Sequence, residues 1–173
     1  MKRLRYGVAA SLDGFIAGPK GEYDWIVKDA AIDFVAMFAQ YDTLLMGRKT
    51  FEVASERGKS WDLFGQRWVV VSRTLKAEDH PGITIISTDV KESVAGLKAL
   101  PGKDIWLFGG GELFRCLLDA GLVDTVEVAL MPVMLGSGTP LLNAGERRLL
   151  RLTENKAMPS GILTLAYDVV RPD

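Results

Sequence analysis

Three short segments of the chain carry residue types that bind phosphate groups. Each directly follows a short apolar run, and together they comprise Gly109, Gly110 and Gly111, then Gly47, Arg48, Lys49 and Thr50, and finally Ser72 and Arg73. A backbone without Cβ atoms can approach a phosphate closely, and hydroxyl and cationic side chains can hydrogen-bond to its oxygens. The three segments therefore predict an anion-binding site.

The glycine triplet has a simpler interpretation, which is a tight turn, but a turn explains one glycine well and three poorly. The GxGxxG fingerprint of dinucleotide-binding domains is not matched, because Phe114 stands where its last glycine belongs. Residues 47–50 resemble the end of a P-loop, but the glycine that opens such a loop is missing upstream. A standard Rossmann domain and a nucleoside triphosphatase are both disfavoured.

The cations at positions 48 and 49 support the prediction of an anion site. A helix is expected from here towards Ser55, and positive side chains at a helix N-terminus oppose its dipole. If the three segments meet, Arg48 and Arg73 could hold a terminal phosphate while Thr50 and the glycines bind a pyrophosphate. Charge-assisted hydrogen bonds of about 1.5–3 kcal/mol each would then favour NADPH over NADH by roughly 10² to 10⁴.

The composition of the 173-residue chain narrows the class of protein. Hydrophobic residues make up 48% and charged residues 25%, and 21 Lys and Arg nearly balance 22 Asp and Glu. These values predict one globular domain over residues 1–173 and disfavour a nucleic-acid or membrane partner. Cys116 and His80 are each the only residue of their type, which rules out an intrachain disulfide and disfavours a transition-metal site. Without a secretory or membrane-spanning apolar run, the chain is expected to be cytoplasmic.

Apolar runs that suit buried strands alternate with segments of helical spacing. The runs span residues 44–46, 68–71, 83–86, 105–108 and 126–131. Helical spacing occurs at Phe34, Val35, Phe38 and Tyr41, at Val94, Leu97 and Leu100, and at Leu113, Phe114, Leu117 and Leu118. This alternation predicts an α/β domain with a largely parallel central sheet and helices on both faces. Residues 149–156 and 162–170 flank the turn MPSG and predict an antiparallel hairpin that closes the sheet edge.

Several motifs, taken in sequence order, resemble the dihydrofolate-reductase-like superfamily, and most closely the reductase domain of riboflavin-biosynthesis deaminase-reductases. They are ASLDGFIA (10–17), DTLLMGRKTFE (42–52), VVVSR (69–73) and IWLFGGGELFRCLLDAGLVDTVEVALMPVMLGSGTPLL (105–142), and they extend over nearly the whole chain. The resemblance implies a dihydrofolate-reductase-like fold with NADPH as the hydride donor. It also agrees with a homodimer, which the apolar closing hairpin makes plausible.

The resemblance assigns roles to individual residues. Phosphates would be held by Gly47, Arg48, Lys49 and Thr50, the region of the adenosine 2′-phosphate by Ser72 and Arg73, and the pyrophosphate by Gly109, Gly110 and Gly111 with Glu112. The nicotinamide would be bordered by Ala9, Ile16 and Ala17. The candidate catalytic residues are Asp33, near the position of a pterin-binding carboxylate, and Asp13 in the SLDG loop. One of these carboxylates or an ordered water would supply the proton.

The function that follows is an NADPH-dependent reductase resembling 5-amino-6-(5-phosphoribosylamino)uracil reductase. It would transfer a hydride to a ribosylamino-pyrimidine or a related imine or carbonyl. One alternative is pterin reduction, which requires Asp33 to face the cleft. The other is a non-catalytic NADPH-binding module, suggested by Tyr6-Gly7 in place of a basic residue and Phe108 in place of a glutamate. The sequence leaves two roles open for four tryptophans, which could pack in the core or contact a substrate. They are Trp25, Trp61, Trp68 and Trp106.

Overall fold

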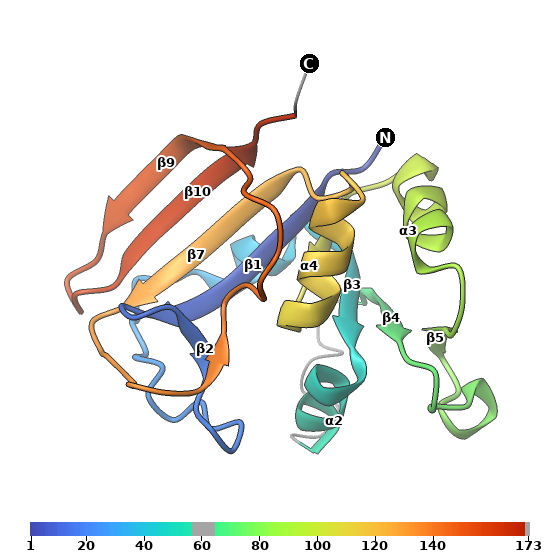
Figure 1. The fold of residues 1–173 in the computed structure, drawn as a ribbon, viewed down its shortest axis with the longest axis horizontal. Helices are drawn as coiled ribbons and strands as arrows, with labels where there is room; N and C mark the ends of the chain where they lie inside the picture. The colour runs from blue at the N-terminus through green and yellow to red at the C-terminus, as the bar shows by residue number, and fades with distance from the viewer. Residues whose placement is uncertain (57–64, 172–173) are drawn as a thin grey trace.

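The computed structural model describes residues 1–56 and 65–171. Within these ranges, eight strands form one sheet in the order β5–β4–β3–β6–β1–β7–β10–β9 (Figure 1). Their bounds are β1 (Leu4–Ser11), β3 (Tyr41–Gly47), β4 (Arg67–Val71), β5 (Ile83–Ile86), β6 (Asp104–Leu107), β7 (Thr125–Met131), β9 (Leu150–Ala157) and β10 (Leu163–Val169). A second, small sheet pairs β2 (Phe15–Ala17) with β8 (Thr139–Pro140) in antiparallel fashion.

The large sheet is parallel from β5 to β7. β1 lies near its centre and pairs in parallel with β6 on one side and β7 on the other. β10 then pairs antiparallel with both β7 and β9. The predicted α/β class, the largely parallel sheet and the C-terminal antiparallel hairpin are therefore confirmed.

Helices cover both faces of this sheet, as the alternation predicted. The helices are α1 (Phe34–Phe38), α2 (Arg48–Glu56), α3 (Val90–Ala99) and α4 (Gly111–Asp119), with a short 3₁₀ turn at Ala77–Asp79. On one face, Val94 of α3 and Leu117 of α4 join a core cluster that includes Tyr6 of β1. On the other face, Phe38 of α1 and Phe51 of α2 pack in a second cluster. Figure 1 shows α4 in front of the strands.

A third cluster lies beside the second, beyond β1, and it fixes the loop that precedes α1. Met131, Met158 and Ile162 form its buried part, and residues of the loop, among them Trp25, pack against it. Trp106 is only 8% exposed and Trp68 is half-buried, and both belong to the second cluster. These three tryptophans thus make core contacts. Trp61 lies outside the described residues.

Two positions that the helical spacing included are not helical. α1 ends at Phe38, and Tyr41 begins β3, where it is 4% exposed and stacks on Trp106. Strand pairing with β6 overrides the local spacing at this point, and Val35 on α1 stays 63% exposed. Leu100 is extended and 42% exposed, because the following proline disfavours a helical conformation.

Candidate functional site

The glycine turn lies at the carboxyl end of β6, where α4 begins. Gly109 has a φ of 87° and Gly110 a φ of 95°, a region that side chains disfavour. Gly110 is the N-cap of α4, and no side chain caps the helix there. The first N–H groups of α4 therefore have no capping acceptor and can bind an anion.

The second predicted segment meets this turn. A Cβ atom on Gly109 would lie 3.4 Å from Thr50 Oγ1, and one on Gly110 would lie 3.8 Å from the backbone nitrogen of Gly47. The loops are also joined by a hydrogen bond of 2.7 Å from Phe108 N to Leu45 O. Hydroxyl and amide groups from two strand ends therefore surround one half-buried stretch of backbone.

Gly111 has a different reason to be glycine. It is buried, and a Cβ atom there would lie 3.1 Å from the carbonyl oxygen of Pro140. The segment around Pro140 is held in place because Leu141 N donates to Gly14 O over 2.8 Å. The third glycine makes room for this segment. The side chain of Glu112, the next residue, is exposed in the first turn of α4.

Cations lie at two of the strand ends. Arg48 Nη1 contacts Glu52 Oε1 at 2.7 Å, one turn along the same helix, and both side chains are more than 40% exposed. Lys49 and Arg73 are exposed and form no ion pair with any residue of the described ranges. Arg48 and Lys49 oppose the dipole of α2, which a bound anion would offset, and the exposed Arg73 is likewise available to a ligand.

Ser72 is buried and shapes the third segment. Its Oγ accepts hydrogen bonds from Thr74 N at 3.2 Å and Leu75 N at 3.0 Å, and its own N–H donates to Ile86 O at the end of β5. The hydroxyl therefore fixes the turn that carries Arg73.

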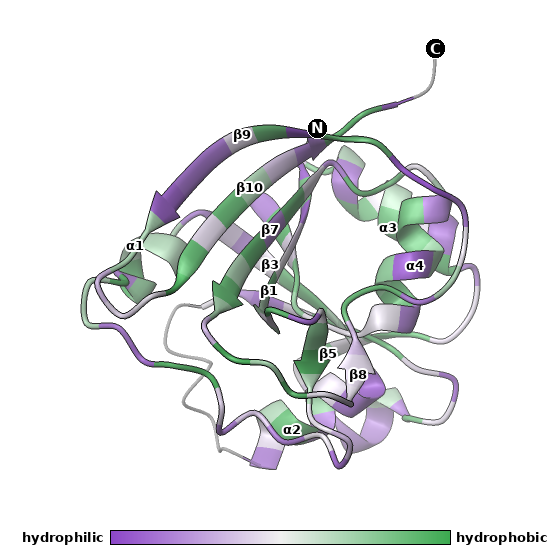
Figure 2. Cartoon of the chain, turned by 60° about the vertical axis from the view of Figure 1, so that its left-hand side comes forward, coloured by the Kyte–Doolittle hydropathy of each residue, from purple (hydrophilic) through white to green (hydrophobic). Residues whose placement is uncertain are grey.

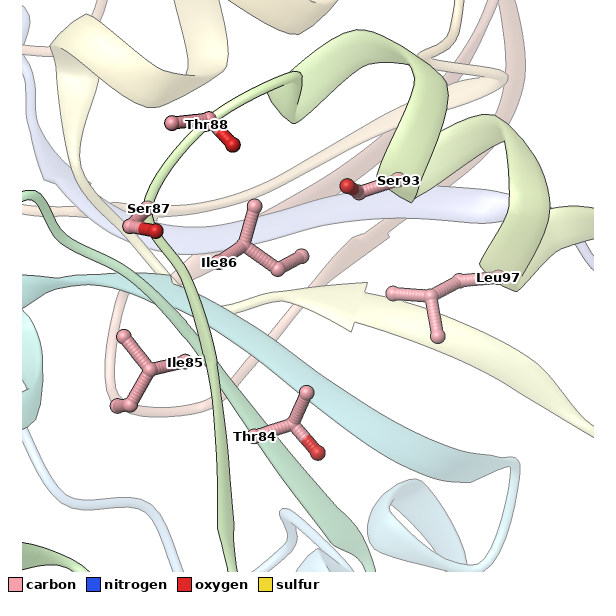
Figure 3. Close-up of a pocket in the computed structure, with 7 residues that line it drawn as sticks. All are labelled: Thr84, Ile85, Ile86, Ser87, Thr88, Ser93 and Leu97. Atoms are coloured by element: carbon pink, nitrogen blue, oxygen red, sulfur yellow. The ribbon is translucent and has the colours of Figure 1, made fainter. Parts of the chain in front are cut away.

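A cavity of about 360 Å³ lies next to this turn, between the end of β5 and α3 (Figure 3). It is lined by Thr84, Ile85, Ile86, Ser87, Thr88, Ser93 and Leu97. Figure 3 shows Ser93 and Leu97 pointing from α3 towards the strand. The sequence analysis missed this cavity, although Ser87 and Thr88 follow an apolar strand just as Ser72 does.

The three residues expected beside the nicotinamide lie on different elements. Ala9 is on β1 and packs against the third cluster, opposite Ala129 of β7. Ile16 is on β2 and packs against the first cluster, on the α4 side. Ala17 is on β2 beside Gly138, whose missing side chain leaves room for the Ala17 carbonyl. The structure thus places Ala9 apart from the β2 residues, on the face of the third cluster.

Asp13 connects two loops. Its carboxylate accepts hydrogen bonds from Ser11 Oγ at 2.6 Å, Leu135 N at 3.0 Å and Gly136 N at 2.7 Å. The Ser11 hydroxyl and then these backbone amides lower the pKa of Asp13 to about 2. At neutral pH the group is an ionised acceptor with both oxygens occupied, which suits a loop anchor better than a proton donor.

Asp33 is the N-cap of α1. Its side chain accepts a 2.8 Å hydrogen bond from Ala36 N and is exposed. Capping alone explains this carboxylate. Asp33 and Asp13, the two candidate proton donors, thus each have a structural role of their own.

The sequence did not predict an ion-pair network on the sheet face that α1 covers. Arg5 Nε contacts Glu127 Oε1 at 2.6 Å, and the Arg5 guanidinium lies 4.7 Å from the centre of the Tyr41 ring. Burial opposes the charge of Arg5, but the hydrogen bonds and charge of Glu127 outweigh it and raise the pKa of Arg5. Burial, together with the charge of Glu127, also raises the pKa of Tyr41, which stays neutral. One signal existed in the sequence, since Glu127 interrupts an apolar strand.

Trp106 and Phe108 form an aromatic wall, and its packing explains why Gly7 and Phe108 differ from the residues that the family resemblance leads one to expect. The indole N–H of Trp106 donates to Gly7 O at 2.9 Å, and a Cβ atom on Gly7 would lie 2.6 Å from the indole nitrogen. Trp106 and Phe108 meet edge to face with ring centres 4.8 Å apart. Any larger residue at position 7 would displace the indole.

A further cavity lies away from the carboxyl ends of the strands. A second cavity of about 360 Å³ is at the amino ends of β3 and β4, next to Asp42 and Arg67. In the part of the chain that the structure describes, no set of three His, Cys, Asp or Glu side chains could hold a metal ion. Across the same residues, no helix combines the length and apolarity needed to span a bilayer.

Comparison with known proteins identifies the fold and the family of this chain. The sheet order and the three loops at one edge define a dihydrofolate-reductase-like α/β fold. The chain belongs to the RibD C-terminal domain family, whose model matches residues 2–164. It is 34% identical over 178 residues to the uncharacterized protein YyaP of Bacillus subtilis (strain 168), covering 96% of this chain and 94% of YyaP.

Two solved structures share the fold. A Shewanella sp. PV-4 protein, provisionally named as a riboflavin biosynthesis protein, has a TM-score of 0.83 and 24% identity, covering 99% of this chain and 100% of that one. A Thermotoga maritima diaminohydroxyphosphoribosylaminopyrimidine deaminase/5-amino-6-(5-phosphoribosylamino)uracil reductase has a TM-score of 0.73 and 16% identity, covering 98% of this chain and 57% of that one.

Proposed function

We propose that this protein is an NADPH-dependent reductase that transfers a hydride to a ribosylamino-pyrimidine or a related imine or carbonyl. The observation that carries the proposal is the meeting of the two loops after β3 and β6, where Thr50 Oγ1 lies 3.4 Å from the position of a Cβ atom on Gly109. Membership of the RibD C-terminal domain family supports a reductase of the riboflavin-pathway type. We also propose a cytoplasmic location, because a single cysteine suits a reducing compartment.

Three groups of residues at the carboxyl ends of the strands would each bind a different part of the coenzyme. Thr50 and the uncapped N–H groups after Gly110 would bind the pyrophosphate, and the unpaired Arg73 would bind the 2′-phosphate. The cavity beside Ser72 would take the adenosine, since its walls combine hydroxyl groups with Ile86 and Leu97. Bound NADPH supplies the hydride.

The substrate would lie on the face that carries Ala9 and Ala129, beside the aromatic wall of Trp106 and Phe108. A flat ring would lie against these short side chains, and much of the rate enhancement would come from alignment. Asp13 is bound by three donors with a pKa of about 2, and Asp33 caps a helix. We therefore propose that water delivers the proton.

An assay of substrate and coenzyme tests this function. The protein is mixed with NADPH or NADH and either 5-amino-6-(5-phosphoribosylamino)uracil or dihydrofolate, and oxidation of the coenzyme is followed. We expect oxidation with NADPH and the pyrimidine. Activity on dihydrofolate alone would show a pterin reductase, and tight NADPH binding with no turnover of either substrate would show a binding module. Failure to bind either coenzyme would refute the proposal entirely.

A further inference from the structure

The loop after β1 and the segment that links β7 to β8 are joined at several points. Leu12 N donates to Val133 O at 2.8 Å, and β2 pairs with β8 in antiparallel fashion. Leu141 N, just beyond β8, donates to Gly14 O at 2.8 Å. Figure 1 shows β2 beside the orange segment that follows β7. We call residues 11–17 and 133–141 together the clasp.

Asp13 supplies a negative charge to the clasp. The second part of the clasp, residues 133–141, contains no charged residue, and Figure 2 shows hydrophobic colour along the stretch that leaves β7. The carboxylate of Asp13 accepts from Leu135 N with Oδ1 at 3.0 Å and from Gly136 N with Oδ2 at 2.7 Å. Hydrogen bonds to an ionised acceptor are stronger than those between neutral groups. The two loops are therefore held by a charged acceptor as well as by backbone pairing.

Ser11 carries the effect of this charge to the start of β2. Its side chain is completely buried, and its hydroxyl donates to Asp13 Oδ1 at 2.6 Å. Because the hydroxyl proton points to Asp13, the oxygen presents a lone pair to Phe15 N, which donates to it at 3.0 Å. Phe15 is the first residue of β2, so the carboxylate fixes the direction in which this strand leaves the loop.

We propose that Asp13 is a positioning residue for hydride transfer, which acts through β2 rather than on the substrate; this inference rests on the proposed function. Ala9, Ile16 and Ala17, the residues expected beside the nicotinamide, lie on β1 and β2. Ser11 is two residues beyond Ala9 on β1, so its contact with Asp13 sets how β2 lies against β1. The phosphates would be bound by other loops, those after β3 and β6. Loss of the Asp13 contacts should therefore slow hydride transfer far more than it weakens NADPH binding.

Asp13→Asn tests the proposal with almost no change of shape. Whichever way the amide is turned, its NH₂ group faces a backbone N–H group, either that of Leu135 or that of Gly136. We expect hydrogen–deuterium exchange of residues 14–17 to become at least about tenfold faster in the absence of coenzyme. In stopped-flow assays with NADPH and 5-amino-6-(5-phosphoribosylamino)uracil, hydride transfer should slow by about 10- to 100-fold. The dissociation constant of NADPH should stay within about threefold of the wild-type value.

Two further variants separate the clasp from a general loss of stability. Ser11→Ala breaks the link to Phe15 but keeps Asp13, so it should cause both changes at smaller magnitude. The matched control is Asp104→Asn, because Asp104 also accepts a backbone N–H group, from Arg3 at 2.9 Å, but lies at the amino end of β6. It should alter neither the exchange of residues 14–17 nor the rate of hydride transfer.

The outcomes that would overturn the proposal are distinct. Unchanged exchange in Asp13→Asn would show that the carboxylate does not fix β2, and equal losses of rate and NADPH affinity would show a general disruption of the coenzyme site. The pH profile of hydride transfer should keep its shape in this variant, since loss of one limb would make Asp13 the proton donor instead. If the wild type oxidises no coenzyme, the proposed function fails, and the exchange measurement still decides whether Asp13 fixes β2.

Discussion

The two ends of the parallel strands differ in how their cations are paired. At the amino end, most cations are paired with carboxylates, namely Lys2 with Asp42, Arg3 and Arg151 with Asp168, Arg5 with Glu127, and Lys98 and Arg171 with Asp124, while the exposed Arg67 and Lys103 form no ion pair with a described residue. At the carboxyl end, Lys49 and Arg73 have no ion-pair partner among the residues that the structure describes, and Arg48 pairs only with Glu52 on its own helix.

This difference separates charges that hold the fold from charges kept for a ligand. Lys98 and its carboxylate are 6% and 16% exposed, so neither can leave the pair without a large desolvation cost. The exposed cations of the carboxyl end cost little while free and can form strong hydrogen bonds with an arriving phosphate. Each of the following substitutions tests one side of this contrast against the other.

The largest effect is expected at the amino end, from Asp124→Ala. Asp124 Oδ2 accepts from Lys98 Nζ and from Leu4 N at 2.7 Å, and Oδ1 accepts from Arg171 Nη2 at 2.9 Å. Its loss leaves the buried Lys98 without a carboxylate partner, so the free energy of unfolding should fall by about 3–5 kcal/mol in urea titrations. Arg171→Ala removes only an exposed contact and should cost less than about 1 kcal/mol. Equal losses in the free energy of unfolding would show that the buried pair contributes no more than the exposed contact.

At the carboxyl end, Arg73→Ala should weaken NADPH binding by about 10- to 150-fold, the equivalent of about 1.5–3 kcal/mol. NADH binding should change little, because NADH lacks the 2′-phosphate. Calorimetric titration with both coenzymes measures the ratio. The control is Arg67→Ala, at the amino end of β4, the strand that precedes Arg73, and it should alter neither affinity. Parallel losses for both coenzymes would contradict the assignment of Arg73.

Gly110→Ala should affect both stability and binding. A side chain at a φ of 95° costs about 1–2 kcal/mol, and the strained turn would no longer present the α4 N–H groups correctly. NADPH and NADH should lose affinity together, since both contain the pyrophosphate. Gly121→Ala is the matched control, because Gly121 has a φ of 68° and lies after α4, away from the turn. It should lower the melting temperature without changing coenzyme affinity.

The smallest effect should come from the partner of Arg48. Glu52→Gln removes an exposed ion pair of the kind that contributes about 0.3–0.5 kcal/mol, so NADPH affinity should rise about twofold. For the same reason, Arg48→Ala should weaken NADPH less than Arg73→Ala does. The reverse order in fluorescence titrations would place the 2′-phosphate nearer to α2.

The strand ends of the candidate site were predictable because each signal was local. Gly47 and Gly109 follow apolar runs, and the carboxyl ends of parallel strands meet at one edge, so their proximity follows from the sheet alone. The hairpin was equally predictable, since residues 149–156 and 162–170 flank a short turn with Gly161.

Long-range contacts account for what the sequence did not reveal. Asp13 was read as a possible catalytic group, and nothing near it in the sequence indicates that Leu135 and Gly136 donate to it. Tyr41 fitted a helical spacing but is fixed in a strand by β6. The glycine of the Tyr6-Gly7 pair is explained only by Trp106, whose indole leaves no room for a Cβ atom at position 7.

The segment at Pro140 affects the stage of synthesis at which the glycine turn is complete. It packs on Gly111 and is tied to the loop after β1 through Gly14, so segments from both ends of the chain surround the glycine turn. A growing polypeptide that has left the ribosome only as far as α4 has its glycines but not this cover. If binding needs this cover, the coenzyme stabilises only late intermediates of biosynthesis, since a ligand stabilises only the states that can bind it.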